Sequence, residues 1–349
     1  MPRHKKDIET IVLEFIKEHP DCHSKDILKV AKKDIGSTTL KLLLHRMFRE
    51  NLISVIGKGK NTKYQISPGY ELLHNISVRE YFKKEIDDRK IRDSFNYELI
   101  NTTLHNTPLF SEKEYKHLIN LQDEYKQNAS VLTPTEYKKE LERLAIDLIW
   151  KSSQIEGNTY SLLETERLIK EQEETTGKTR DEATMILNHK AALDFIIANR
   201  TFINPLTICA IEDIHSLLIK DLRVDRNIRI GRVGISGTNY KPLDNEHQIR
   251  EALQDLCNLI NGQKDVFSKA LLALLVISYI QPFADGNKRT ARIISNAILM
   301  NNEYCPISFR TVDTIEYKQA MLIFYEQNNI SAFKNIFIDQ FAFAVETYF

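Results

Sequence analysis

The sequence predicts a mainly α-helical protein in two parts: a small N-terminal domain that ends in a β-hairpin, and a larger helical domain with one further hairpin. Apolar residues recur at three- and four-residue spacing along most of the 349 residues. The capping box Thr133-Pro134-Thr135-Glu136 marks the start of one long helix. Two segments, 52–66 and 231–242, instead combine glycine-containing turns with β-branched residues, which favours hairpins.

The composition is that of an ordinary soluble protein, with 42% hydrophobic and 28% charged residues. The longest apolar run, 270–280, is too short to cross a bilayer, and we recognise no signal peptide, so we expect no membrane partner. The four cysteines lack metal-ligand or CxxC spacing. We therefore expect reduced thiols in a cytoplasmic protein at Cys22, Cys209, Cys257 and Cys305.

The charge is unevenly distributed along the chain. There are 48 basic and 48 acidic residues in total, and residues 1–70 hold 14 and 8 of them, which leaves 34 and 40 for the remainder. The N-terminal part therefore has a net charge of +6 and the rest −6. A basic segment on an acidic body indicates that this segment meets a polyanion.

Residues 1–70 are expected to form three short helices, at 7–19, at 25–33 and from Ser37 or Thr38, followed by the hairpin 52–66 with a basic tip. This order resembles a winged helix-turn-helix domain, whose third helix would enter the major groove of duplex DNA. The DNA-binding candidates are Lys41, Arg46, Arg49, Lys58, Lys60 and Lys63. The alternative is a protein-interaction module. Pro68-Gly69 is expected to close the domain, and 71–132 to form a helical linker and helices that pack on the next domain, with 76–91 helical.

The polar loop after the apolar run 270–280 is the strongest candidate site. A helix that begins near Gly286 would direct unpaired backbone N–H groups and a positive dipole end into this loop. Arg289 and Arg292 would lie on one side of that helix, and Asp285 offers a hard oxygen ligand beside them. Together these groups suit a nucleotide phosphate with Mg²⁺. The alternative is a polar helix-loop-helix corner without a ligand.

The full string of residues 281–292, Gln-Pro-Phe-Ala-Asp-Gly-Asn-Lys-Arg-Thr-Ala-Arg, resembles the Fic family signature, His-Pro-Phe-x-Asp-Gly-Asn-Gly-Arg-x-x-Arg. Gln281 occupies the position of the His, and Lys288 that of the second Gly. The Asn-Lys-Arg-Thr run is similar to the Doc branch, whose members transfer a phosphate. The resemblance implies an all-helical Fic domain over 133–349 that binds ATP or another nucleotide and holds Mg²⁺ on Asp285. The implied phosphate-binding residues are Gly286, Asn287, Lys288, Arg289 and Arg292.

A second motif ends the helix near 141–157. Glu156 places a carboxylate at an already negative helix end and therefore needs a cation, while Gly157 suits the left-handed residue that follows a helix. Ser152, Glu156 and Gly157 are similar to the inhibitory helix of Fic proteins. In that family the Glu pairs with the last signature Arg and blocks the γ-phosphate position, which implies a Glu156–Arg292 pair. The alternative is a purely structural ion pair.

The segment 231–242 is expected to form a hairpin, which the resemblance identifies as the flap that aligns a target polypeptide by strand addition. The implied docking residues are Val233, Gly234, Ile235, Ser236, Gly237 and Tyr240. The alternative is a surface hairpin without a ligand.

Fic enzymes move AMP, or another phosphate-containing group, from a nucleotide to a hydroxyl of a target protein, and the signature His takes the hydroxyl proton. The Gln281 amide has no basic lone pair at neutral pH, and general-base catalysis contributes roughly 10²–10⁴-fold. We therefore expect a regulatory, nucleotide-binding protein of Fic fold with a DNA-binding winged helix, weak or inactive as an AMP transferase. The alternative is an active protein adenylyltransferase, or another phosphate-group transferase with variant chemistry. The oligomeric state, including a homo-oligomer, is left open.

Overall fold

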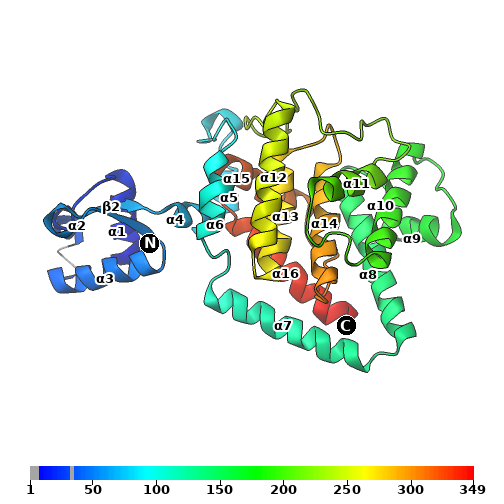
Figure 1. Ribbon diagram of the computed structural model, residues 1–349, viewed down its shortest axis with the longest axis horizontal. Helices are drawn as coiled ribbons and strands as arrows, with labels where there is room; N and C mark the ends of the chain where they lie inside the picture. Colours follow the sequence, from blue (N-terminus) through cyan, green and yellow to red (C-terminus); the bar gives the residue numbers. More distant parts are fainter. Residues whose placement is uncertain (1–7, 32–34) are drawn as a thin grey trace. The chain divides into compact units, whose positions relative to one another are not determined.

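A computed structural model describes residues 8–31 and 35–349 of the chain. The chain divides into two compact units, Met1–His74 and Asn75–Phe349. The fold is mainly α-helical, as predicted, and the described residues form sixteen α-helices and one two-stranded sheet (Figure 1). No helix among these residues is long and apolar enough to span a membrane.

The first unit contains three helices, an antiparallel hairpin in which Ile53 lies opposite Ile66, and a final short helix. Its core is formed by side chains from all three helices and the first strand, among them Val12, Ile16, Ile27, Leu44 and Ile53. The predicted helix ends at Asp7 and Lys33 lie outside the described residues. The elements are α1 (Ile8–Glu18), α2 (Ser24–Ala31), α3 (Ser37–Arg49), β1 (Ile53–Ile56), the 3-10 turn η1 (Gly59–Asn61), β2 (Lys63–Ile66) and α4 (Pro68–Leu73).

Pro68 begins a helix, whereas the sequence analysis assigned Pro68-Gly69 to the end of the domain. The Ser67 side chain accepts a hydrogen bond from the Tyr70 amide, and Pro68 occupies the first helical position. A proline there gives up no hydrogen bond that the helix needs, because the first N–H groups of a helix have no partner.

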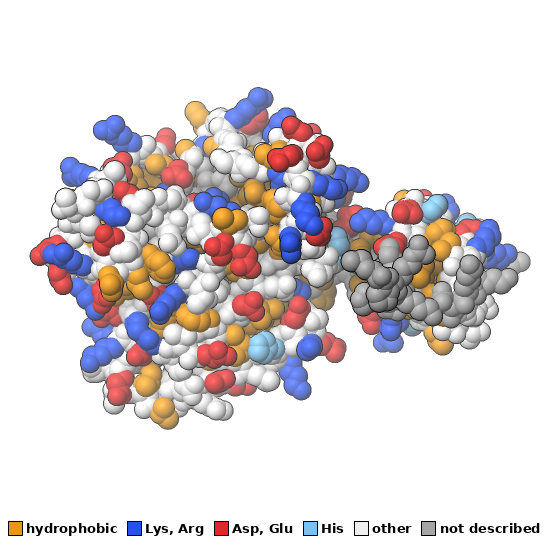
Figure 2. Space-filling view, turned by 180° about the vertical axis from the view of Figure 1, so that it is seen from behind, with side chains coloured by type: hydrophobic (Ala, Val, Ile, Leu, Met, Phe, Trp, Pro, Cys, Tyr) orange, Lys and Arg blue, Asp and Glu red, His pale blue; other side chains and the backbone are white. Residues whose placement is uncertain are grey.

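The second unit is formed almost entirely by helices, and basic and acidic side chains are both spread over the face of it that Figure 2 shows. The helices α7, α8, α9 and α10 each begin with a complete capping box, as predicted for α8. The elements are α5 (Val78–Tyr81), the 3-10 turn η2 (Ile86–Asp88), the π-helical turn η3 (Leu99–Thr103), α6 (Leu104–Asn106), α7 (Glu112–Val131), α8 (Pro134–Ile155), α9 (Leu162–Glu171), α10 (Arg180–Ala198), α11 (Ile208–Leu218), α12 (Glu246–Gly262), α13 (Val266–Ile280), α14 (Asn287–Asn301), α15 (Thr314–Gln327) and α16 (Ser331–Tyr348).

Helix α13 is the central helix of this unit. Each residue from Ala270 to Ile280 is at most 1% exposed, which is typical of a helix that is hydrophobic all round. It packs against α12, α14 and α15, and α14 also packs against α8, α10 and α11 (Figure 1). The loop 281–286 between α13 and α14 is therefore held by the best-packed part of the molecule.

Two predictions for this unit are wrong. Residues 76–91 do not form a continuous helix; they contain only α5 and η2, because the backbone of Glu85 between them is extended and the Lys90 carbonyl accepts a hydrogen bond from the Gln327 side chain. The segment 231–242 makes a turn but no β-ladder, since the structure assigns paired strands only to β1 and β2 within the described residues. Its second limb pairs elsewhere: the Lys241 amide donates to the Asp93 carbonyl at 3.1 Å.

The start of α13 yields a stability prediction. The Asp265 carboxylate accepts hydrogen bonds from the amides of Phe267 and Ser268. Asp265→Ala should lower the free energy of unfolding by about 1 kcal/mol, measured by urea denaturation, because two amide donors lose their cap. As a control, Asp244→Ala should change it by less than about 0.5 kcal/mol, because Asp244 pairs with Arg232 in solvent. Equal losses in both variants would contradict the assigned role of the cap.

Candidate functional site

The loop 281–286 is shaped by two left-handed residues. Gln281 ends α13 with φ 52° and ψ 59°, and Gly286 precedes α14 with φ 81°. A Cβ on Gly286 would lie 3.3 Å from atoms of His215 and Ile219, so conformation and space both favour glycine there. No side chain caps α14, so its first amides remain available to a ligand.

The Gln281 side chain is buried and fixed by hydrogen bonds. Its Nε2 donates to the Ser278 carbonyl at 2.7 Å, and its Oε1 accepts from Asn287 Nδ2 at 2.9 Å. The Asn287 amide in turn bonds to both backbone groups of Phe283 at 2.8 Å. Two neutral amides thus hold each other and the loop, with no group that accepts a proton at neutral pH.

His215 lies beneath the loop. Its ring stacks on Phe283 with centroids 3.6 Å apart, and its Nε2 lies 3.0 Å from the Asp285 carbonyl oxygen. Its Nδ1 lies 3.3 Å from the Arg226 carbonyl, but a neutral imidazole donates to only one of the two. Burial lowers the pKa of His215, although both carbonyl contacts raise it. His215 therefore supports the loop as a neutral ring.

The two signature arginines are buried. Arg289 is 1% exposed and donates from Nη2 to Asp285 Oδ2 at 2.8 Å, while its Nε and Nη1 have no hydrogen-bond partner within the described structure. Arg292 is 0% exposed and lies over the Tyr317 ring, with 5.4 Å from Cζ to the centroid. Its Nη1 also has no hydrogen-bond partner in the part of the chain that the structure describes. Such unsatisfied guanidinium groups favour a nearby anion.

Glu156 supplies a carboxylate directly after α8. Its Oε1 accepts from Arg292 Nη2 at 2.7 Å, and its Oε2 lies 3.4 Å from Lys288 Nζ. Burial raises the pKa of Glu156, but the charges of Arg292 and Lys288 outweigh burial and lower it to about 2. Gly157 follows with φ 101°, the left-handed conformation expected from the sequence. The expected Glu156–Arg292 ion pair is present, and Lys288 joins it.

Ser152 connects Arg292 to a buried histidine. Arg292 donates from Nε to Ser152 Oγ at 2.8 Å, and that hydroxyl lies 2.9 Å from His189 Nε2. Burial and the charge of Arg289 lower the pKa of His189 to about 3. The neutral ring can then donate from Nδ1 to the Met185 carbonyl at 3.1 Å and accept the Ser152 proton at Nε2. This series of hydrogen bonds fixes the orientation of Arg292.

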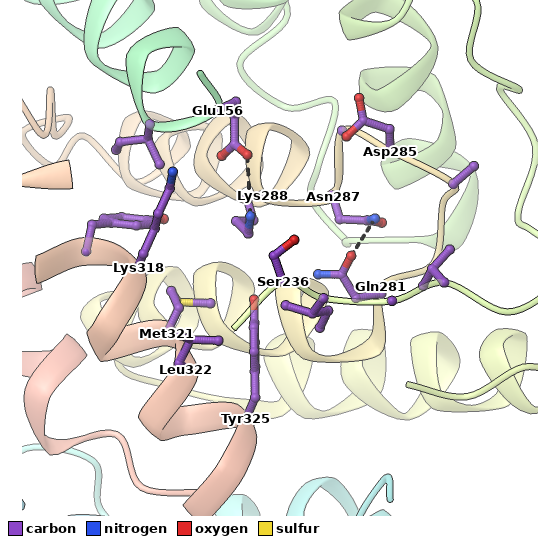
Figure 3. A pocket seen from close by; sticks show the side chains of 17 residues that line it. Glu156, Ser236, Gln281, Asp285, Asn287, Lys288, Lys318, Met321, Leu322 and Tyr325 are labelled. Atoms are coloured by element: carbon purple, nitrogen blue, oxygen red, sulfur yellow. Dashed lines mark hydrogen bonds and ion pairs between the residues drawn. The ribbon is translucent and has the colours of Figure 1, made fainter. Parts of the chain in front are cut away.

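The loop 281–286, the start of α14 and Glu156 line a cavity of about 390 Å³ (Figure 3). On one side of the cavity lie Glu156, Asp285, Asn287 and Lys288, and on the other lie side chains of α15. Ser236 lies between them (Figure 3). The cavity is lined by Ile155, Glu156, Val233, Gly234, Ile235, Ser236, Gln281, Ala284, Asp285, Gly286, Asn287, Lys288, Tyr317, Lys318, Met321, Leu322 and Tyr325. Arg289 and Arg292 do not line it, because they are covered in this conformation.

The flap segment, residues 231–242, contributes unequally to the cavity. Residues 233–236 line it, while Gly237 forms the turn with φ 87°. Tyr240 does not face the cavity: it is 2% exposed, stacks on Tyr279 and donates to the Tyr279 carbonyl at 3.1 Å. The prediction that Tyr240 belongs to a docking surface is therefore wrong, because burial removes it from contact with a target.

Asp285 fits the predicted cation only as a partial site. Its side chain is 64% exposed at the cavity, and one oxygen is engaged by Arg289. The residues that the structure describes contain no cluster of three or more His, Cys, Asp or Glu side chains that could hold a metal. Mg²⁺ is commonly held by one or two carboxylates together with substrate phosphates, and a single exposed Asp beside a phosphate site fits that pattern.

The predicted DNA-binding residues lie on α3 and the hairpin. Lys41, Arg49 and Lys58 are exposed and Lys63 is half-buried, whereas the side chain of Lys60 lies outside the described part of the structure. Arg46 is engaged within the unit, since it pairs with Glu9 and Glu50.

Residues 205–299 match the model of the Fic/DOC family. The chain carries a Fic/DOC family domain. The matched region includes the flap segment, α13 and the α14 N-terminus, and so spans a large part of the cavity wall. Glu156 and α15 lie outside it.

Curated relatives of the Fic/DOC domain are modestly similar to this chain. The protein adenylyltransferase fic-1 of Caenorhabditis elegans is 24% identical over 237 residues, which cover 66% of this chain and 46% of that protein. The protein adenylyltransferase Fic of Aedes aegypti is 30% identical over 176 residues, which cover 46% and 33%. The chain spans less than half the length of these relatives.

Solved structures show the same fold. A fragment of C. elegans Fic-1 (aa134 - 508) matches with a TM-score of 0.59 and 20% identity over 68% of this chain and 72% of that one. A Fic domain containing signaling protein from Bacteroides thetaiotaomicron matches with a TM-score of 0.56 and 19% identity over 66% and 94%. The fold of the Fic domain is thereby shown.

Several residues that line the cavity were not predicted from the sequence. Lys318, Met321, Leu322 and Tyr325 follow three- and four-residue spacing on α15 and form one wall. That spacing alone indicates a core-facing helix, so no signal separated them from packing residues. His189 and His215 had no signal either, because they are single histidines within amphipathic helices.

The lowered pKa of Glu156 predicts a pH dependence. Its folded pKa of about 2 lies below the ordinary value of 4.5, so the ion pair stabilises the fold above pH 4.5 and this contribution is lost as the pH falls toward 2. Glu156→Gln should therefore be less stable than the parent at pH 6, by up to about 3 kcal/mol, and the difference should shrink below pH 4.5. Thermal unfolding across pH measures this. Glu166→Gln, on the exposed face of α9, is the control; a pH-independent difference for Glu156→Gln would contradict the assignment.

Proposed function

We propose that the Fic domain binds a nucleoside triphosphate with Mg²⁺ in the 390 Å³ cavity, and that the protein has little or no AMP transferase activity. The observation that carries this proposal is the uncapped start of α14 at the cavity, with Lys288 beside it and Arg292 behind Glu156. Backbone amides, the helix dipole and these cations favour a polyphosphate. The adenylyltransferase relatives support ATP as the nucleotide.

Gln281 is the reason to expect little turnover. Proton removal from a target hydroxyl needs a base, and the Gln281 amide is neutral and already bonded to Ser278 and Asn287. Without a general base a transfer slows by roughly 10²–10⁴-fold. Asp285 would hold Mg²⁺, which neutralises phosphate charge when bound. The groups proposed to bind phosphate do not include the imidazole that Gln281 replaces in the signature.

Glu156 is proposed to restrict the site. Its carboxylate occupies the face of Arg292 that is directed to the cavity, and a phosphate brought there would meet both a like charge and an occupied guanidinium. Full engagement of a triphosphate therefore requires that Glu156 moves away. This corresponds to the inhibitory role that the Fic resemblance implies.

The flap offers a place for a target protein. No backbone–backbone hydrogen bond is made by residues 233–236 among the described residues, and these residues line the cavity. An extended target segment could add along this limb by main-chain hydrogen bonds. A protein hydroxyl brought there would lie beside the proposed phosphate site.

Calorimetry with ATP and Mg²⁺ tests nucleotide binding. Glu156→Ala should bind ATP at least about tenfold more tightly than the parent, because the competing carboxylate is gone. Lys288→Met should weaken binding, and Glu166→Ala on the surface of α9 should leave it unchanged. Equal ATP affinity in the parent and in Glu156→Ala would contradict the proposal.

DNA binding is a second proposed function, carried by the basic residues exposed on α3 and the hairpin of the first unit. These elements have the order of a winged helix-turn-helix. Lys41 and Arg49 would contact phosphates or bases, whereas Arg46 already pairs with Glu9 and Glu50.

Fluorescence anisotropy of the full chain with labelled duplex DNA tests this function. Affinity should fall steeply with salt, and the double variant Lys41→Ala/Arg49→Ala should reduce the log–log salt slope by about 2. Lys29→Ala is the control, because Lys29 pairs with Asp26 on α2. Binding that ignores salt, or equal slopes in all variants, would exclude this role.

A further inference from the structure

The flap turn rests on helix α15. A Cβ on Gly237 would lie 3.3 Å from Leu322 Cδ1, so the turn lies directly on that side chain. Leu322 itself lines the cavity. Glu326 follows four residues later, on the same face of α15. The position of the turn over this face therefore sets the width of the cavity between the flap and α15.

Arg89 connects the flap turn to the same face of α15. Its Nη1 donates to Glu326 Oε1 at 3.0 Å, and its Nη2 donates to the Gly237 carbonyl at 2.9 Å. The two charged side chains are 3% and 0% exposed. A guanidinium can make both bonds because its donors form a planar fork, which a lysine ammonium lacks.

Tyr81 and Arg92, which lie near Arg89 in the chain, also contact Glu326. The Tyr81 hydroxyl donates to Glu326 Oε2 at 2.5 Å, and burial together with this bond raises the pKa of Tyr81, so the phenol keeps its proton. The Arg92 amide donates to the Glu326 carbonyl at 2.9 Å. Tyr81 thus fixes the Glu326 carboxylate that orients Arg89, and the Arg92 amide holds the Glu326 backbone.

Residues 87–94 also hold the second limb of the flap. Asn239 donates to Asp87 Oδ1 at 3.2 Å, and the Lys241 amide donates to the Asp93 carbonyl at 3.1 Å, beside a parallel bridge between Ser94 and Lys241. The edge of the second limb is therefore occupied by the chain itself. The first limb, residues 233–236, remains the edge that faces the cavity.

We propose that Arg89 is a positioning residue for the nucleotide site, which acts by holding the Gly237 carbonyl over α15. The expected effect on ATP affinity rests on the proposed nucleotide binding, whereas the contact of Arg89 with Gly237 and Glu326 does not. A buried ion pair by itself is weak evidence of a stabilising role, since apolar pairs of similar size often replace it without loss. What an apolar pair cannot replace is the bond to the flap carbonyl.

Hydrogen exchange and calorimetry on the full chain test the proposal with Arg89→Met/Glu326→Met. The double variant removes both charges together, so it leaves no unpaired buried charge. Asp147→Leu/Arg310→Met is the matched control. In that group Arg310 and Tyr348 both donate to Asp147, a carboxylate, arginine and tyrosine set of the same composition whose bonds do not involve the flap, although Arg310 is 38% exposed.

In the Arg89 double variant, the hydrogen-bonded flap amides of Tyr240 and Lys241 should exchange about tenfold faster than in the parent, because the flap opens more readily when its bond to a charged donor is lost. Its ATP affinity should fall by a similar factor, while the control changes neither. Unchanged flap exchange, or faster exchange with unchanged ATP affinity, would overturn the proposal. Arg89→Lys, which keeps the charge, should loosen the flap as well. If the parent binds no ATP, faster flap exchange still supports the positioning role, and only the proposed function fails.

Discussion

The interaction on which the site depends is the pairing of Arg292 with Glu156. Arg292 is wholly buried, and a buried charge without a partner costs about 3–5 kcal/mol. An anion must therefore stand beside it in every conformation. The chain supplies one from the end of α8, and a phosphate is the other anion that fits the chemistry of the loop. Folding and the proposed phosphate binding thus involve the same guanidinium, and its charge explains how a carboxylate at an unfavourable helix end is tolerated. Lys288 shares this carboxylate, so release of Glu156 would free two cations for one polyphosphate.

The other half of the site is neutral. Gln281 and Asn287 bond to each other and to the backbone of Ser278 and Phe283, which keeps Gln281 in a left-handed conformation that costs a non-glycine residue about 1–2 kcal/mol. The arrangement preserves the shape of the loop but offers no proton acceptor. The proposed binding and turnover are therefore separable in this domain: the groups proposed to bind phosphate belong to α14, whereas a proton acceptor would have to stand at the end of α13.

Local signals predicted much of this architecture. One capping box and apolar periodicity predicted the long helices, and the Fic resemblance implied the Glu156–Arg292 pair, whose members are 136 residues apart. The failures lie where backbone groups choose distant partners. The limb at Lys241 bonds to Asp93 instead of to its own hairpin, and in residues 76–91 the Lys90 carbonyl accepts a hydrogen bond from Gln327 instead of continuing a helix. The cavity-lining residues of α15 could not be predicted, because side chains that face a ligand have the same helical spacing as side chains that face the core. Such choices depend on tertiary contacts that no short segment encodes.

We propose that this Fic domain binds phosphate groups but offers no proton acceptor at Gln281. Incubation with ATP labelled at the α-phosphate and Mg²⁺, followed by detection of label on protein, tests it directly in Glu156→Ala and in Glu156→Ala/Gln281→His. The single variant should transfer little label, and the added imidazole should raise transfer by roughly 10²-fold or more. Strong labelling by Glu156→Ala alone would contradict this proposal, because a working transferase would then operate with Gln281 in place.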